Sequence, residues 1–150
     1  MSGVEYKIKC ANKSTIFDHL KECNDDFVPP LYQRVHLGRY ANKIHRNSVT
    51  FEAWAKNRLV GLLAAYFNDS EDQIGFITSV SVTADYSGQG IASKLANSCI
   101  THAKQIHFKK LRLEVHKNNF TAIHLYRKVG FVELETKYDS LFMELDIPPV

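Results

Sequence analysis

Apolar and polar residues alternate in several separate stretches of the chain, which is the pattern of strands with one buried face. The longest alternation covers residues 74–82, IGFITSVSV, and it predicts that Thr78, Val80 and Val82 lie on the same face of a strand. Further strands are expected at residues 4–10, 49–55, 59–67, 110–116, 131–135 and 140–147. Residues 56–58, Lys-Asn-Arg, separate two of these stretches and predict a tight hairpin.

Apolar residues recur at helical spacing between the strand-like stretches. This spacing predicts helices over residues 12–23, 31–47, 91–106 and 118–130, and Gly130 is a typical residue to end the last of them. An antiparallel meander therefore leads into a strand-helix-strand crossover. The expected fold class is α+β: a twisted, mostly antiparallel mixed sheet of about seven strands, with a β-α-β crossover and about four helices on its faces.

Length and composition indicate an ordinary globular protein. The 150 residues suit a single domain over residues 1–150, and a formal net charge of +3 is too small for the basic surface of a nucleic-acid-binding protein. Three cysteines without CxxC spacing argue against a disulfide framework or a metal site. The N-terminal stretch lacks the apolar region of a secretion signal, and no stretch reaches the roughly 18 apolar residues of a membrane span. We therefore expect a cytoplasmic protein that binds no metal, membrane or nucleic acid.

Gly88 and Gly90 lie where the strand pattern of residues 74–82 gives way to the helical pattern of residues 91–106. The first amides of a helix have no intrahelical partner, and small residues let an anion such as a pyrophosphate approach them closely. A tight turn without any ligand explains the two glycines equally well. The loop is not a dinucleotide-binding GxGxxG, because Ser93 occupies the third glycine position, and the chain lacks the GK[ST] of a P-loop.

Two spaced motifs resemble the core motifs of the GNAT family of N-acetyltransferases. At the start of the helical stretch over residues 91–106, Ser87-x-x-Gly90-x-Ala92 is similar to the family's (Q/R)xxGx(G/A) pattern, with Ser87 in place of the usual arginine or glutamine. Further on, the family's NxxAxxLYxxxGF pattern corresponds to Asn119, Ala122, Leu125, Tyr126, Gly130 and Phe131. The resemblance covers residues 74–131, and it implies a GNAT-like fold with acetyl-coenzyme A (acetyl-CoA) as co-substrate.

The resemblance also implies a binding site for acetyl-CoA. The backbone amides of residues 88–93 would hold the pyrophosphate, and Ser81 and Val82, on a strand that diverges from residues 110–116, would pair with the pantetheine arm. Asn119 resembles the residue that reaches toward this arm, although helix capping explains it equally well. The expected cofactor-binding residues are therefore Ser81, Val82, Gly88, Gln89, Gly90, Ile91, Ala92, Ser93, Asn119 and Tyr126.

The candidate catalytic residues are Tyr126 and His116. Tyr126 resembles the family's general acid, a phenol that donates a proton to the departing CoA sulfur; without the motif it would more simply be an aromatic core residue. His116 could be the general base because histidine titrates near neutral pH, although a surface histidine at a strand end is the simpler interpretation. Glu71 and Asp72 are alternative bases in a polar turn, where acidic residues are usually only solvated. No base is assigned.

The amine acceptor is expected between the N-terminal third of the chain and the last loop, as the resemblance implies. Arg34, Arg39 and Tyr138 are the candidate substrate-binding residues. Arg39, Lys43 and Arg46 share one helical face, which is either simply solvated or forms a basic rim for a phosphorylated acceptor such as a nucleotide-linked amino sugar.

The sequence thus predicts an enzyme, an N-acetyltransferase that moves the acetyl group of acetyl-CoA to a primary amine of a small molecule by direct attack in a ternary complex. Its partners would be acetyl-CoA and the amine, without a metal, and the exposed last strand could pair two copies into a homodimer. The alternative is a non-catalytic sensor or interaction module that keeps the CoA cleft. That hypothesis is motivated by Ser87 and by the lack of a carboxylate in residues 75–78.

Overall fold

The computed structural model describes residues 3–149, and in this part of the chain seven strands form one sheet. The strands are β1 (Glu5–Ile8), β2 (Val49–Ala55), β3 (Arg58–Tyr66), β4 (Ile74–Val82), β5 (Lys110–His116), β6 (Val132–Lys137) and β7 (Ser140–Asp146). The helices are α1 (Lys13–Cys23), α2 (Leu37–Asn47), α3 (Ile91–Gln105) and α4 (Phe120–Lys128). The strand order is β1-β2-β3-β4-β5-β7-β6, and every neighbouring pair is antiparallel except β4 and β5. The expected mixed sheet, with its crossover through α3, is confirmed.

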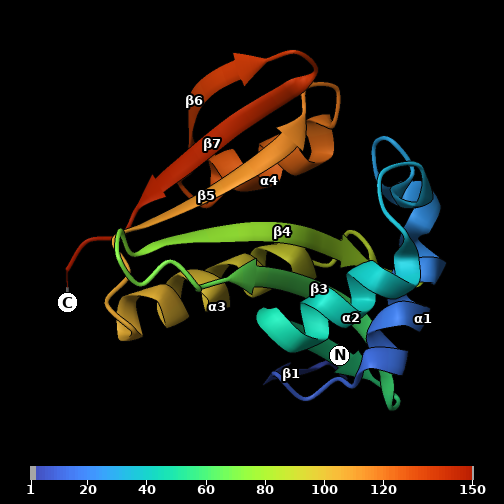
Figure 1. Cartoon of the computed structure of the whole chain (residues 1–150). Helices are drawn as coiled ribbons and strands as arrows, with labels where there is room; N and C mark the ends of the chain where they lie inside the picture. The colour runs from blue at the N-terminus through green and yellow to red at the C-terminus, as the bar shows by residue number, and fades with distance from the viewer. Residues whose placement is uncertain (1–2, 150) are drawn as a thin grey trace.

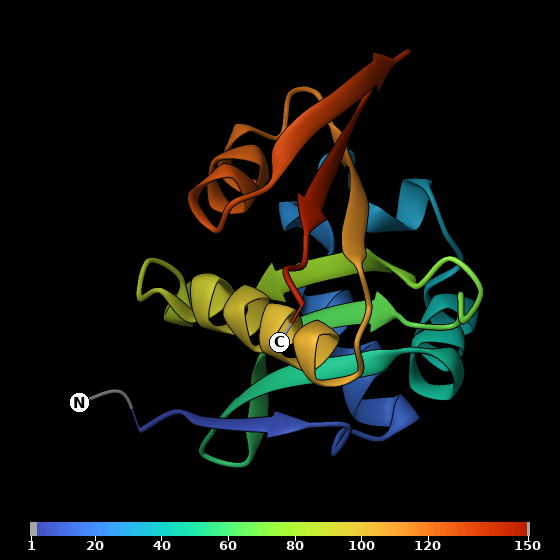
Figure 2. The same cartoon turned by 90° about the vertical axis from the view of Figure 1, so that its left-hand side faces the viewer.

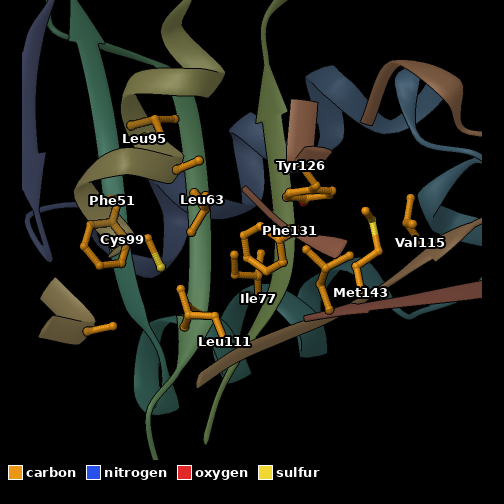
Figure 3. Close-up of a cluster of buried hydrophobic side chains, with 14 of the residues drawn as sticks. Phe51, Leu63, Ile77, Leu95, Cys99, Leu111, Val115, Tyr126, Phe131 and Met143 are labelled. Carbon is orange, nitrogen blue, oxygen red and sulfur yellow. The ribbon is translucent and has the colours of Figure 1, made fainter. Parts of the chain in front are cut away.

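Helices cover both faces of the sheet, with α1 and α2 on one face and α3 on the other (Figures 1 and 2). On β3, Leu62 and Ala64 pack with α1 and α2 in one core cluster, whereas Leu63 and Ala65 pack with α3 in another. Because side chains alternate along a strand, β3 is buried from both sides. The α3 cluster continues through β5 and β7 to α4, where it includes Tyr126 (Figure 3).

The hairpin between β2 and β3 is the tight turn that the sequence predicts. Lys56 and Asn57 are its two central residues, and their φ angles are 51° and 62°. Two consecutive residues with positive φ form a type I′ turn, whose twist matches that of the strands it joins. The prediction from residues 56–58 is therefore confirmed, with Arg58 as the first residue of β3.

The second predicted helix is wrong at its N-terminal end. The helical spacing predicts a start at Leu31, but α2 begins at Leu37. Short 3₁₀ turns precede it at Asn24–Asp26 (η1) and Leu31–Gln33 (η2). His36 Nδ1 accepts a hydrogen bond from the Arg39 N–H at 3.2 Å, so the His36 side chain caps the helix and defines its start. Residues 24–36, called the 24–36 segment below, therefore form an irregular connection between α1 and α2.

A β-bulge in β4 changes which residues face each side of the sheet. Ile77 and Ser79 pair with consecutive residues of β3, which leaves Thr78 without a partner in that strand. The extra residue shifts the alternation by one position, so Ile77 and Val80 both pack in the α3 cluster. Thr78 contacts the opposite side, where the Tyr40 hydroxyl of α2 donates a hydrogen bond to its carbonyl at 2.8 Å. The predicted shared face is therefore wrong for Thr78 and right for the two valines.

Glu52 in the middle of β2 is fully buried, with 0% of its surface exposed. Four donors surround its carboxylate: the N–H groups of Cys10 and Ala11 at 3.1 Å, the Thr50 hydroxyl at 2.6 Å and the Trp54 indole N–H at 2.9 Å. Because each carboxylate oxygen accepts hydrogen bonds, the cost of burying the charge is offset. Glu52 therefore holds Cys10 and Ala11, which lie just before α1, against β2 through these hydrogen bonds.

Candidate functional site

β4 and β5 diverge after a short paired stretch (Figure 1). They are hydrogen-bonded only over residues 74–77 and 110–113, although β4 continues to Val82 and β5 to His116. Beyond the paired stretch the facing edges have no strand partner among residues 3–149, and such an edge can pair with an extended molecule. The divergence that the resemblance implies for these strands is therefore confirmed.

A cleft of about 830 Å³ opens at this divergence, a size typical of small-molecule sites. Its walls come from β4, from the turn before α3, from β5 with α4, and from the 24–36 segment. The lining side chains include Phe27, Val28 and Arg34 on one side and His116, Asn119 and Tyr126 on another. The cleft therefore offers room for two reactants, one along β4 and α3 and one beside the 24–36 segment.

Gly88 and Gly90 form the part of the cleft at the N-terminus of α3. Their φ angles are +77° and +80°, which favour glycine, and a Cβ atom on either residue would meet no protein atom within 4 Å. Gly90 is the N-cap of α3. Because glycine has no side chain to cap the helix, the first amides of α3 remain available to a ligand. The open space and these amides together suit an anion such as a pyrophosphate.

Ser87 contributes no charge at this end of the cleft. Its hydroxyl donates a hydrogen bond to the Ala84 carbonyl at 2.8 Å, within the 3₁₀ turn Ala84–Tyr86 (η3). An anion held here would therefore depend on backbone amides and on the helix dipole rather than on a cation at position 87.

Tyr126 on α4 lies between the core and the cleft. Only 5% of its surface is exposed, it lines the cleft, and its ring contacts Phe131 edge to face with 5.5 Å between centroids (Figure 3). Burial raises the pKa of its phenol well above the usual value, because a buried phenolate would lose its hydration. The phenol of Tyr126 therefore stays protonated at neutral pH.

His116 and Asn119 lie on the cleft wall where β5 leads into α4. The Asn119 side chain accepts a hydrogen bond from the Ala122 N–H at 3.2 Å, so its interpretation as a helix cap is confirmed. His116 Nδ1 accepts a hydrogen bond from the Asn118 N–H at 3.1 Å. The proton of the neutral ring therefore lies on Nε2, so in this arrangement neither ring nitrogen of His116 has a free lone pair to take up a proton.

Three of the predicted site residues lie outside the cleft lining. Gln89 is exposed in the turn before α3, Arg39 is exposed on α2, and Tyr138 is 89% exposed in the turn between β6 and β7. The alternative bases Glu71 and Asp72 are exposed in the turn before β4 and also lie outside it. The predicted residues that the cleft brings together are Arg34, Ser81, Val82, Gly88, Gly90, Ile91, Ala92, Ser93, His116, Asn119 and Tyr126.

His19 of α1 forms a hydrogen-bonded pair with Ser81 of β4, a contact that sequence reasoning missed. His19 is only 2% exposed; its Nδ1 lies 3.0 Å from the Leu59 carbonyl oxygen and its Nε2 lies 2.9 Å from Ser81 Oγ. The pair joins residues 62 positions apart, so no local pattern connects them. The available signal is that His19 belongs to the buried stripe of α1, where a polar side chain needs partners.

Burial of His19 makes the stability of the fold depend on pH. It lowers the pKa of the imidazole below the ordinary 6.5, because the charged ring would lose its hydration. The unfolded chain takes up this proton first, so stability is lost as the pH falls from 6.5 toward the folded pKa. Urea unfolding at about pH 7.5 and about pH 5 should show a smaller loss for His19→Gln than for the wild type. His102, whose pKa burial also lowers, affects both proteins alike, so equal losses would contradict this assignment.

Two features are absent from residues 3–149. No group of three or more histidine, cysteine, aspartate or glutamate side chains in this range could hold a metal ion. No helix among these residues combines the length and the apolar composition needed to cross a membrane.

Comparison with known proteins relates the chain to one family. The model of the Acetyltransferase (GNAT) family matches residues 14–131. The chain is 31% identical over 72 residues to N-alpha-acetyltransferase 30 of Saccharomyces cerevisiae, a match that covers 48% of this chain and 41% of that protein. It is 27% identical over 74 residues to the spermine/spermidine N(1)-acetyltransferase of Bacillus subtilis, with 49% of each protein covered. The chain thus spans less than half the length of these two curated relatives.

Solved structures share the fold. The PaiA N-acetyltransferase of Thermoplasma acidophilum, solved in complex with coenzyme A, superposes with a TM-score of 0.76 at 15% sequence identity. The match covers 95% of this chain and 99% of that one. At such low identity the likeness shows the fold alone.

Proposed function

Because this chain belongs to the acetyltransferase (GNAT) family, we propose that it transfers the acetyl group of acetyl-CoA to a primary amine. The observation that carries the proposal is the divergence of β4 and β5 beside the N-terminus of α3, with Tyr126 on the wall of the cleft. An elongated thioester can lie along the free edge of β4 with its phosphates at α3. The fold relative from Thermoplasma acidophilum contains coenzyme A, which supports this choice of donor.

The chemistry requires that the amine lose a proton and that the leaving sulfur gain one. A neutral amine attacks the thioester carbonyl, and the sulfur leaves with the electron pair of its bond to carbon. Tyr126, whose phenol burial keeps protonated, would give that sulfur a proton, and the proton that the attacking nitrogen releases as the amide forms would restore the phenol. The unpaired edge of β4 would hold the donor in place through backbone hydrogen bonds. Binding and protonation of the leaving group are thus assigned to different walls of the cleft.

The amine would enter beside the 24–36 segment. Phe27 and Val28 line the cleft there with apolar surface, and Asp26 and Arg34 bring opposite charges. The residues of the expected basic rim, Arg39, Lys43 and Arg46, do not line the cleft, whereas the separately predicted Arg34 does. The two curated relatives are named for different amines, an N-alpha amine in one and spermine or spermidine in the other. The mixed lining supports a small primary amine as the acceptor.

Gly88→Asn tests the phosphate site. Asparagine adopts positive φ more readily than most residues, and the space beside Gly88 contains no protein atom within 4 Å, so stability should stay within about 1 kcal/mol of wild type. The new side chain would occupy the space of the diphosphate, and we expect the Kd for CoA to rise about tenfold or more. Gly3→Asn is the matched control, because Gly3 also has a positive φ and open surroundings but does not line the cleft. The same Kd for both variants in titration calorimetry would contradict the site.

Release of the CoA thiol in the presence of different amines tests the proposed reaction. The panel consists of spermidine, an unblocked peptide and a nucleotide-linked amino sugar, and the form of each in which every amino group is acetylated is its matched control. We expect thiol release with at least one free amine and with none of the acetylated forms. Binding of acetyl-CoA without transfer to any amine would contradict the enzyme and favour the sensor module.

A further inference from the structure

We propose that Ser81 and His19 form a proton relay for the acceptor amine, in which Ser81 Oγ contacts the ammonium group and His19 Nε2 is the base. The relay rests on the proposed acetyl transfer. It supplies the base that the other candidates do not, because Nδ1 of His116 already accepts the hydrogen bond of the Asn118 N–H and Glu71 and Asp72 lie outside the cleft.

The tautomer of His19 follows from its two partners. The Leu59 carbonyl, 3.0 Å from Nδ1, can only accept a hydrogen bond, so Nδ1 carries the proton of the neutral ring. Nε2 then has a free lone pair and accepts the hydrogen bond from Ser81 Oγ at 2.9 Å. The proton of Ser81 is therefore already directed at a base, as in other activated hydroxyl groups.

The surroundings keep His19 neutral until it receives a proton. Burial lowers the pKa of its imidazole, and the charged groups that act on it, Glu22 on α1 and Arg58 on β3, oppose each other. Cys23 Sγ lies 3.8 Å from Nε2, and burial raises the pKa of this thiol to about 12. The thiol therefore stays uncharged, and Ser81 on β4 is the partner through which a proton can reach Nε2.

Ser81 faces the acceptor side of the cleft. It pairs with Leu62 of β3, which packs with α1 and α2, whereas Val80 and Val82 pack on the α3 side. Ser81 lines the cleft together with Phe27, a residue of the segment that follows α1. Its hydroxyl therefore lies across β4 from the N-terminus of α3, on the side where the amine would enter.

The relay conserves protons and charge. An ammonium N–H bond breaks as its proton moves to Ser81 Oγ, and the Ser81 O–H bond breaks as that proton moves to His19 Nε2. The amine nitrogen keeps the electron pair that it needs for attack, and the imidazole becomes an imidazolium. After the product leaves, the imidazolium returns its proton through Ser81 to water in the cleft.

Substitutions at both positions separate a relay from a merely structural contact. His19→Gln keeps a polar group near Ser81 but cannot take up the proton, Ser81→Ala removes the hydroxyl, and Ser81→Thr retains it. Cys23→Ala is the matched control, because it changes the packing beside His19 and leaves the relay intact. Each protein is assayed with the amines of the panel above and, separately, with hydroxylamine, which is neutral near pH 7 and needs no base.

With an ammonium acceptor, we expect kcat to fall about 100-fold in His19→Gln and Ser81→Ala, to recover in Ser81→Thr, and to stay near wild type in Cys23→Ala. With hydroxylamine, every variant should stay within about threefold of wild type once the uncatalysed reaction is subtracted. The kcat of the wild type should fall at acidic pH as His19 is protonated, and this fall should disappear in His19→Gln.

Equal losses with both kinds of acceptor, or an unchanged kcat with the ammonium acceptor, would overturn the relay. If His19→Gln does not fold, the Ser81→Ala and Ser81→Thr pair still decides the question. A wild-type protein that acetylates no amine would overturn the proposed function and the relay with it. An active wild type with an equally active Ser81→Ala would overturn the relay alone.

Discussion

Replacing Tyr126 by phenylalanine is expected to lower kcat for acetyl transfer by about 10²–10⁴-fold while the Kd for CoA stays unchanged. The substitution removes the proton donor and keeps the ring, which packs against Phe131 in the core. The departing sulfur would then leave as an unprotonated thiolate, which raises the barrier of the chemical step without affecting the bound donor. Steady-state thiol release gives kcat, and titration calorimetry with CoA gives Kd.

Tyr66→Phe is the matched control for this measurement. Tyr66 is a partly buried tyrosine at the end of β3 that does not line the cleft, so the same loss of a hydroxyl there should leave kcat near the wild-type value. Equal activity of Tyr126→Phe and wild type would contradict the role of general acid and would leave Tyr126 as an aromatic residue of the core.

Replacing Glu52 by alanine is expected to lower the free energy of unfolding by about 3–5 kcal/mol, because it removes the acceptor of four hydrogen bonds, two of them from buried residues. The buried donors of Ala11 and Thr50 would lose their acceptor, and the partly buried donors of Cys10 and Trp54 would lose theirs. Each unsatisfied buried donor costs about 1–3 kcal/mol. Urea unfolding measures the change directly, provided that the m-value is preserved.

Glu135→Ala is the control for charge alone, because Glu135 lies on β6, where every residue is exposed. Its loss should change the free energy of unfolding by no more than about 0.5 kcal/mol. A similarly small change in Glu52→Ala would contradict the view that Glu52 holds the chain before α1 on the sheet.

The parts of the fold that depend on neighbouring residues were predictable from the sequence. The hairpin at Lys56 and Asn57 could be predicted from the short polar stretch between two strand patterns. The strands and helices could be predicted because their apolar residues recur every two residues or at helical spacing. The bulge at Thr78 was not predictable, because it exists only in the pairing of β4 with β3. The start of α2 was misplaced because the apolar spacing extends back to Leu31. The side chain of His36, which lies just before the helix, caps α2 so that the helix begins at Leu37.

Some residues of the candidate site could likewise be predicted from the sequence, and others required the tertiary structure. Gly88, Gly90 and Tyr126 belong to motifs whose spacing is visible in the chain, and all three line the cleft. Arg39 was named from its charge, which says nothing about the direction of its side chain, and it lies elsewhere. The bond between His19 and Ser81 forms only when α1 docks on β4, so it required the tertiary structure.

The claim on which the account depends is that the cleft between β4 and β5 binds acetyl-CoA, and thermal unfolding with and without this ligand tests it most directly. At about 100 times its Kd the ligand should add about 2.7 kcal/mol of stability, a rise in Tm of roughly 5–10 °C for a domain of this size. We expect this rise for the wild type and a smaller one for Gly88→Asn. No rise with either acetyl-CoA or CoA would contradict the binding site and, with it, the proposed acetyl transfer.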